Sequence, residues 1–188
     1  MMAQDSTIFN SFSCIGRLMR ILIRKAKKGD AEGKNDVFNE GLRRGLYKYT
    51  GGNAPTRSKE NKALDKRISR NKEGFFFVAV DKETGRIVGY SGFHTKDRGR
   101  TRHRGELNWM VHPDYLKKGI GTRLLKAVLK EAKRCGFKRA EAEVATKNVA
   151  SIRLAKRCGM KIEGQRSAGL VLDDGTYVDT YLFGKMLR

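Results

Sequence analysis

The chain has 188 residues, enough for one domain with a substantial core, and its 41 Lys and Arg against 20 Asp and Glu give a net charge of +21. This excess favours polyanionic partners, such as a nucleotide cofactor, RNA, the ribosome or an anionic membrane surface, and disfavours free cationic substrates such as polyamines. No run of about 18 apolar residues occurs, so no membrane-spanning segment is expected.

Three cysteines without CxxC spacing predict neither a disulfide framework nor a zinc site, and they favour a reducing cytoplasm. Residues 1–18 are polar and lack a basic segment followed by an apolar core, so they do not resemble a signal peptide. We expect them to form a disordered extension, with a single domain over residues 19–188.

Elements in the first part of the chain follow from the spacing of apolar residues and from turn residues. They are a strand at Ile21–Arg24, a helix ending near Gly45, a short basic helix at about 58–71, an antiparallel hairpin of 75–80 with 87–94, and a strand at 106–111. The loop at 95–105 is the most basic short loop of the chain.

In the second part of the chain, the same patterns predict two further helices and three or four strands. The elements are a helix from Gly121 to Gly136, a strand at 138–145, a helix capped by Asn148 and ending at Gly159, a strand from Met160, and a hairpin of 170–172 with 177–183. Strands and helices in this order predict an α/β fold with a mixed sheet in a single domain.

The stretch from Trp109 to Leu125 reads as a strand, a tight loop carrying Gly119 and Gly121, and the start of a helix. The first N–H groups of a helix lack intrahelical acceptors, and the helix dipole favours an anion there, so the loop predicts a phosphate or pyrophosphate site. The sequence does not match a Walker A loop, because no Lys-Ser/Thr pair follows the second glycine. It does not match the dinucleotide-binding motif either, because Leu124 stands where that motif has its third glycine.

This segment and the later KNVASIRLAKRCGMKIEG together resemble the GNAT superfamily of acetyl-CoA-dependent N-acetyltransferases, most sharply over residues 106–164. The resemblance implies a mostly antiparallel sheet with a splayed central pair, flanked by helices. It implies acetyl-CoA as cosubstrate and no metal.

Cofactor-binding residues carry over from the family motif position by position. The resemblance implies that three strand residues offer backbone groups to pantetheine and the acetyl carbonyl: Trp109, Met110 and Val111. It implies that six loop residues cradle the pyrophosphate: Lys117, Lys118, Gly119, Ile120, Gly121 and Thr122. It also implies that Asn148 contacts the pantetheine side of the cofactor.

Two positions depart from the family pattern. Leu116 stands where members usually carry Gln or Arg, and we expect Lys117, Lys118 or Arg123 to replace that contact. Ala155 stands where many members carry the Tyr that protonates the departing thiolate, and this leaves the general acid unassigned. Tyr177 and Tyr181 are weak substitutes for it.

The acceptor amine must lose a proton before it attacks the thioester, so a base is needed. Glu106 opens the cofactor-binding strand at a position where similar members carry Glu, and Glu143 matches the base proposed in some protein N-terminal acetyltransferases. Each could instead be a surface carboxylate paired with Lys or Arg. His94 and His112 are alternatives, with His112 expected to be structural.

The C-terminal segment GQRSAGLVLDDGTYVDTYLFGKML resembles members that acetylate protein N-termini, including ribosomal proteins, and members that act on small amines. The acceptor is therefore expected to be a protein N-terminus or an amino-acid-like amine. The alternative is a non-catalytic module that binds RNA or the ribosome through basic loops. The sheet edges are also compatible with a homodimer.

Overall fold

The computed structural model describes residues 20–45, 74–95 and 99–188. The expected N-terminal extension and the helix at 58–71 lie outside these ranges. The described elements are β1 (Ile21–Lys25), α1 (Ala31–Arg43), β2 (Gly74–Asp81), β3 (Ile87–Thr95), η1 (Gly99–Thr101), β4 (Arg104–Val111), η2 (Pro113–Tyr115), α3 (Ile120–Arg134), β5 (Arg139–Ala145), α4 (Val149–Arg157), β6 (Lys161–Val171) and β7 (Tyr177–Met186).

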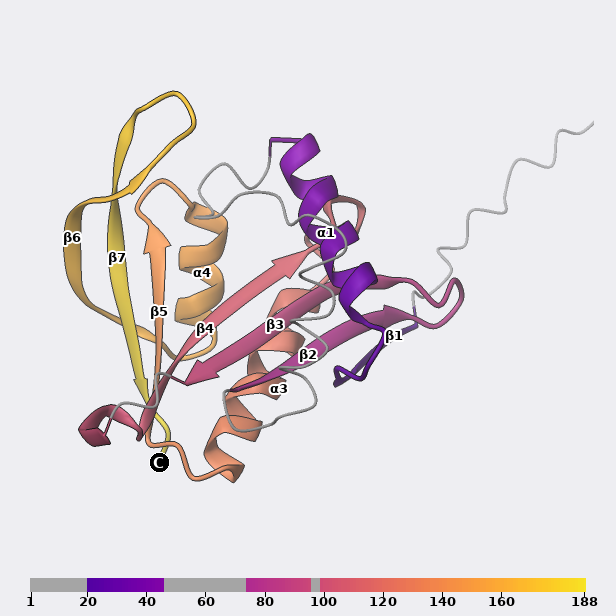
Figure 1. Ribbon diagram of the computed structural model, residues 1–188, viewed down its shortest axis with the longest axis horizontal. Coiled ribbons are helices and arrows are strands. Elements are labelled where there is room, and N and C mark those ends of the chain that lie inside the picture. Colours follow the sequence, from indigo (N-terminus) through magenta and orange to yellow (C-terminus); the bar gives the residue numbers. More distant parts are fainter. Residues whose placement is uncertain (1–19, 46–73, 96–98) are drawn as a thin grey trace, which may run out of the picture.

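The strands form one seven-stranded sheet in the order β1-β2-β3-β4-β5-β7-β6, and β4–β5 is its one parallel pair in the described residues (Figure 1). All other neighbours are antiparallel. The mixed, mostly antiparallel α/β fold predicted from the sequence is therefore confirmed.

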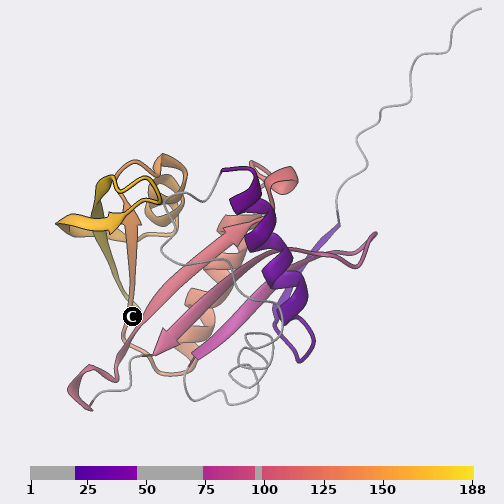
Figure 2. The same cartoon turned by 45° about the horizontal axis from the view of Figure 1, so that its top comes forward.

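Helices cover both faces of the β1–β4 half of the sheet (Figure 2). On one face, Val37 and Phe38 of α1 pack with Tyr90 and Met110. On the other face, the apolar side of α3 packs on β1–β4, and Leu124 contacts the cluster around Val111. β4 thus lies in the middle of the core, and its backbone position is fixed from both sides.

The last hairpin pairs as predicted, but its first strand is longer than expected. The sequence indicates two short strands between Met160 and Leu172, whereas β6 is continuous from Lys161 to Val171, with register shifts against β7. One shift lies between Arg166 and Leu170, where Ala168 has φ of +49°. Because most of β6 is exposed at the edge of the sheet, it lacks the alternating pattern that marks a strand in sequence.

No helix in the described ranges has the length and apolarity needed to cross a membrane.

Candidate active site

A slot opens where β4 and β5 stop pairing. Their hydrogen-bonded register runs only from Arg104 opposite Arg139 to Glu106 opposite Glu141, while β5 stays paired with β7 along its whole length. Beyond Glu106 the two strands diverge (Figure 1). A cavity of about 310 Å³ fills the gap, lined by residues 107–111 of β4, residues 143–145 of β5, the first turns of α4, and Leu116. The splayed central pair expected from the sequence is present.

The glycine loop lies at the end of β4, where the slot opens toward α3. Gly119 is the N-cap of α3 with φ of +74°, and Lys117 also has a positive φ, of +59°. A Cβ on Gly119 would meet no atom within 4 Å, so the glycine is required for its left-handed backbone and not for lack of space. This conformation leaves the first N–H groups of α3 at an exposed turn, as an anion site requires.

Two of the three cations expected to replace a side chain at Leu116 are engaged elsewhere. Lys118 donates through Nζ to the carbonyl of Asp114 at 2.9 Å. Arg123 donates through Nη2 to the carbonyl of Ile21 at 2.7 Å. The exposed side chain of Lys117 is therefore the cation that best fits a phosphate at this loop.

Hydrogen bonds fix both walls of the slot. Ser91 donates through Oγ to the carbonyl of Asn108 at 2.8 Å, which holds β4 against β3. Across the slot, Trp109 donates through Nε1 to Oγ of Ser151 in α4 at 3.2 Å. Asn148 accepts at Oδ1 from the N–H of Ser151, so it caps α4 as predicted while also lining the cavity. Sequence reasoning missed Ser91 and Ser151, because neither stands in a recognisable motif.

Glu106 and Glu143 lie on the same face of the sheet, close to the split. Glu106 is the last residue of β4 that pairs with β5, and it lies opposite His94 on one side and Glu141 on the other. Glu143 is two residues beyond Glu141, so its side chain points to the same face, and it lines the slot. The structure therefore brings the two candidate bases to one region, although Glu106 does not line the cavity.

Both oxygens of Glu143 are held by neighbouring side chains. Thr180 of β7 donates to Oε1 and Arg166 of β6 donates to Oε2, each at 2.6 Å. These two contacts hold the Glu143 carboxylate in place at the edge of the slot. Arg166 and Thr180 were not predicted as site residues, because their partner lies more than 20 positions away in sequence.

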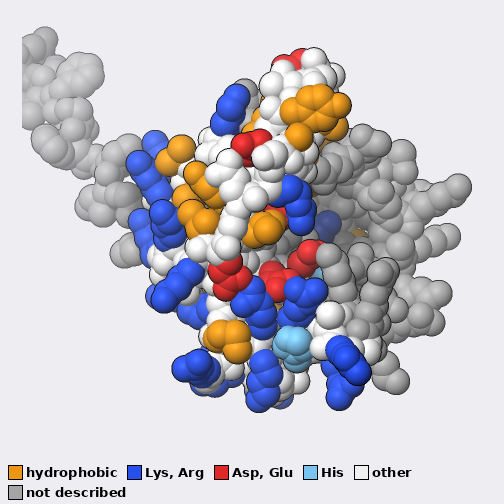
Figure 3. All heavy atoms as spheres, turned by 90° about the vertical axis from the view of Figure 1, so that its left-hand side faces the viewer, with side chains coloured by type: hydrophobic (Ala, Val, Ile, Leu, Met, Phe, Trp, Pro, Cys, Tyr) orange, Lys and Arg blue, Asp and Glu red, His pale blue; other side chains and the backbone are white. Residues whose placement is uncertain are grey.

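Three glutamates on this side of the molecule, Glu141, Glu143 and Glu163, are paired with arginines. Figure 3 shows a small group of Asp and Glu side chains surrounded by Lys and Arg. Below the split, Arg104 pairs with Glu141 at 2.9 Å, and Arg139 pairs with both Glu141 and Glu163. These pairs link β4, β5 and β6 at the point from which the slot opens.

The two histidines considered as alternative bases have different environments. Asn108 accepts at Oδ1 from the N–H of Gly92, so its Nδ2 donates to Nε2 of His94 at 2.9 Å. His112 is buried, accepts from the N–H of Asp114 and caps η2, and burial lowers its pKa. These contacts fit the structural role expected of His112.

No tyrosine replaces the missing acid near Ala155 in the described part of the chain. Ala155 is fully buried in the main core cluster, and its methyl group carries no proton. Tyr177 is 70% exposed at the start of β7, opposite Val171, and Tyr181 packs against the core cluster. Neither tyrosine lines the slot.

Comparison with known proteins agrees with this geometry. Residues 20–161 match the family model described as an acetyltransferase (GNAT) domain. The chain is 30% identical over 144 residues to an L-amino acid N-acyltransferase of Escherichia coli K12. The matched region covers 76% of this chain and 81% of that protein. It is 35% identical over 89 residues to an L-methionine sulfoximine/L-methionine sulfone acetyltransferase of Salmonella typhimurium LT2, covering 47% and 52%.

A solved structure extends the likeness to the fold and the cofactor. The structure of yncA from Salmonella typhimurium with its cofactor acetyl-CoA superposes with a TM-score of 0.75 at 25% identity, and covers 89% of this chain and 94% of that chain.

Proposed function

The chain belongs to the GNAT family of acetyltransferases and is an acetyl-CoA-dependent acyltransferase, and on that premise we propose that it acetylates the α-amine of a small, amino-acid-like acceptor. The slot between β4 and β5 beside the Gly119 loop is the observation that carries this proposal. The names of the two similar enzymes, which act on L-amino acids and on methionine derivatives, support the acceptor class. A non-catalytic role for the whole domain is accordingly set aside.

The residues at the slot fit acetyl-CoA. The N–H groups of residues 119–122 would hold the pyrophosphate, with Lys117 as the nearby cation. Trp109, Met110 and Val111 would offer backbone groups to the pantetheine and to the acetyl carbonyl, while Asn148 faces them from α4. Backbone donors suit this role because they neither titrate nor change position when charge develops on the carbonyl oxygen. Bound acetyl-CoA supplies an acetyl group activated as a thioester.

Glu106 is the residue we assign as the base. It lies at the last position of β4 that pairs with β5, just before the slot begins, and it can take a proton from the amine directly or through one water. Glu143, held by Arg166 and Thr180, lines the slot and would help to orient the acceptor there. The amine then attacks the thioester directly, in a ternary complex.

The leaving thiolate requires no tyrosine in this scheme. A thiol ionises with a pKa of about 8.5, so its thiolate is a tolerable leaving group near neutral pH. Since Ala155 cannot donate a proton, we propose that solvent protonates the thiolate after it leaves.

A protein N-terminus is the second candidate acceptor. The net charge of +21 favours it, because positive charge attracts the enzyme to a polyanion such as the ribosome, whereas it gives little attraction for a small zwitterion.

Release of free thiol from acetyl-CoA tests the proposal and separates the two acceptors. The panel would contain free L-amino acids and methionine sulfone, short peptides with the same N-terminal residues, and Nα-acetyl amino acids as controls that lack the amine. We expect release with free amino acids at least tenfold faster than with the peptides, and none with the blocked controls. A preference for peptides would select the second acceptor, and no release with any amine would overturn both.

A further inference from the structure

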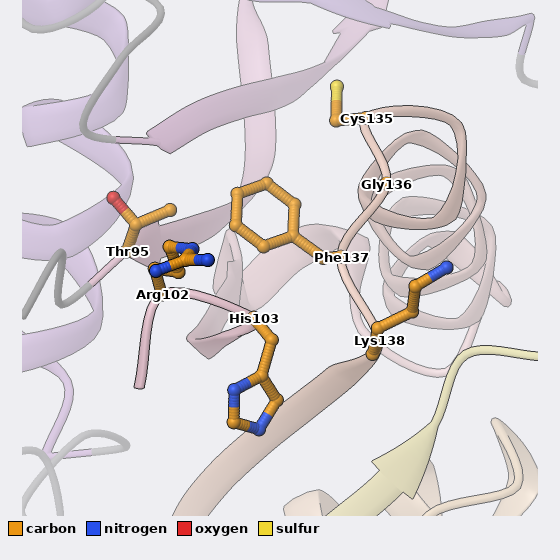
Figure 4. Close-up of a pocket in the computed structure, with 7 residues that line it drawn as sticks. All are labelled: Thr95, Arg102, His103, Cys135, Gly136, Phe137 and Lys138. Carbon is orange, nitrogen blue, oxygen red and sulfur yellow. The ribbon is translucent and has the colours of Figure 1, made fainter. Parts of the chain in front are cut away.

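A second cavity, of about 450 Å³, lies at the opposite end of β4 from the glycine loop. It is bounded by the chain that leads into β4 and by the turn that joins α3 to β5 (Figure 4). Because β4 is eight residues long, this cleft lies roughly 25 Å from the loop at residues 117–122. It is therefore separate from the proposed cofactor site.

The cations at this cleft carry no ion pairs in the described residues. Arg102 and Lys138, which line the cleft, are exposed, and neither of them contacts a carboxylate in the described ranges. By contrast, Arg104 and Arg139, the residues that begin β4 and β5, are paired with Glu141. Uncompensated positive charges placed side by side repel one another, so an anionic partner would stabilise them.

The end of helix α3 does not account for these cations. Its last carbonyl groups, those of Glu131, Ala132 and Lys133, accept from the N–H groups of residues 135, 137 and 136. Its last turn also carries Lys133 and Arg134, which complement the helix dipole. Arg102 and Lys138 are thus surplus to what the helix terminus needs.

Aromatic side chains are interleaved with the positive charges. The ring of Phe137 points toward Arg102 and Thr95, whereas the side chains of His103 and Lys138 extend away from the ring in this view (Figure 4). Phe137 is held from behind by Phe93, with ring centroids 4.7 Å apart. A cation beside an anchored ring is the combination that binds a phosphate and stacks an unpaired base.

We propose that this cleft binds single-stranded RNA. Arg102 and Lys138 contact phosphates of the backbone, while Phe137 and His103 provide stacking surfaces for a base. The net charge of +21 adds long-range attraction for the same partner. The proposal is independent of which amine is acetylated.

Fluorescence anisotropy with a labelled twelve-nucleotide uridine RNA measures the binding directly. We compare the unaltered protein with two double variants that have the same net charge as each other. The cleft variant is Arg102→Glu/Lys138→Glu, and the control is Lys126→Glu/Lys130→Glu on the exposed side of α3. The cleft variant is expected to bind at least tenfold more weakly than the α3 variant. For the cleft variant, the slope of the logarithm of the RNA association constant against the logarithm of the salt concentration should be less steep by about 1.4, as expected for two lost phosphate contacts.

A thiol-protection measurement locates the bound RNA. Cys135 is exposed at the cleft, whereas Cys158 is buried and reports on unfolding. We expect the RNA to slow alkylation of Cys135, followed by mass spectrometry, at least fivefold, without changing Cys158. Equal weakening by both double variants, no protection of Cys135, or no binding at low salt would each overturn the proposal. Thiol release from acetyl-CoA by the cleft variant should stay unchanged, so the two proposals fail separately.

Discussion

At the scale of single residues, Glu106 is the proposed base for the proton-transfer step. Replacing it by Gln should lower the rate at neutral pH by about 10²-fold, because the acceptor amine is then mostly protonated and lacks a positioned base. The rate should recover as pH rises and the amine loses its proton to solvent. The measurement is the pH profile of kcat/KM.

Glu141→Gln is the matched control, since Glu141 lies opposite Glu106 on β5 and is held by Arg104 and Arg139. It should leave the shape of the pH profile unchanged. An unaltered profile for Glu106→Gln would reassign Glu106 as a structural carboxylate.

Gly119 is the second residue on which the site depends. Gly119→Ala places a Cβ on a backbone with φ of +74°, which should cost about 1 kcal/mol of unfolding free energy. Any shift of the turn also moves the N–H groups of residues 120–122, so the Kd for acetyl-CoA should rise. Thermal unfolding and calorimetric titration measure the two effects.

Gly136→Ala is the matched control, which distinguishes a loss of stability from a loss of acetyl-CoA binding. Gly136 follows the end of α3 with φ of +86° and also has no atom near its missing Cβ. It should cost the same stability and leave acetyl-CoA binding unchanged. Equal Kd values for the two variants would remove the loop from the binding site.

The strand β4 and the helix α4 act as the two walls of the slot, and the Trp109–Ser151 hydrogen bond joins them. Trp109→Phe keeps an aromatic ring but removes the indole donor, so the wall should loosen and KM for acetyl-CoA should rise several-fold. Ser151→Ala removes the acceptor and should give the same rise. The double variant should be no worse than either single one, whereas additive effects would show that the bond does not act as a unit.

Helix α3 is tied to β1 through Glu131, and this makes stability sensitive to acid. The hydrogen bond from Arg134 lowers the pKa of Glu131 to about 2, and Lys25 adds to this effect, although burial opposes it. The contribution to stability is therefore present above the ordinary pKa of 4.5 and is lost as pH falls from about 4.5 toward 2. It amounts to about 2 kcal/mol, discounted because Lys25 and Arg134 are largely exposed.

Chemical unfolding between pH 7 and pH 2 measures this linkage. Glu131→Gln should be less stable at pH 7 and should lose less stability on acidification than the parent chain. Parallel curves for the two proteins would mean that Glu131 contributes nothing to the acid transition.

Across the whole molecule, local patterns predicted the order of elements and the glycine loop, because hairpin turns, helix caps and apolar spacing are encoded within a few residues. Contacts between distant segments were not predictable in this way. Arg123 reaches the carbonyl of Ile21, and Arg166 reaches Glu143, through side chains that no local pattern marks. The exposed strand β6 was divided in the prediction for a related reason, since an edge strand lacks alternating burial.

The central claim is that the split between β4 and β5, together with the Gly119 loop, forms the acetyl-CoA site. A crystal structure of the protein grown with acetyl-CoA tests it most directly. We expect density for the pantetheine between residues 107–111 and 143–145, and a pyrophosphate within hydrogen-bond distance of the N–H groups of residues 119–122. Density for the cofactor elsewhere, or a pyrophosphate that does not touch this loop, would contradict it.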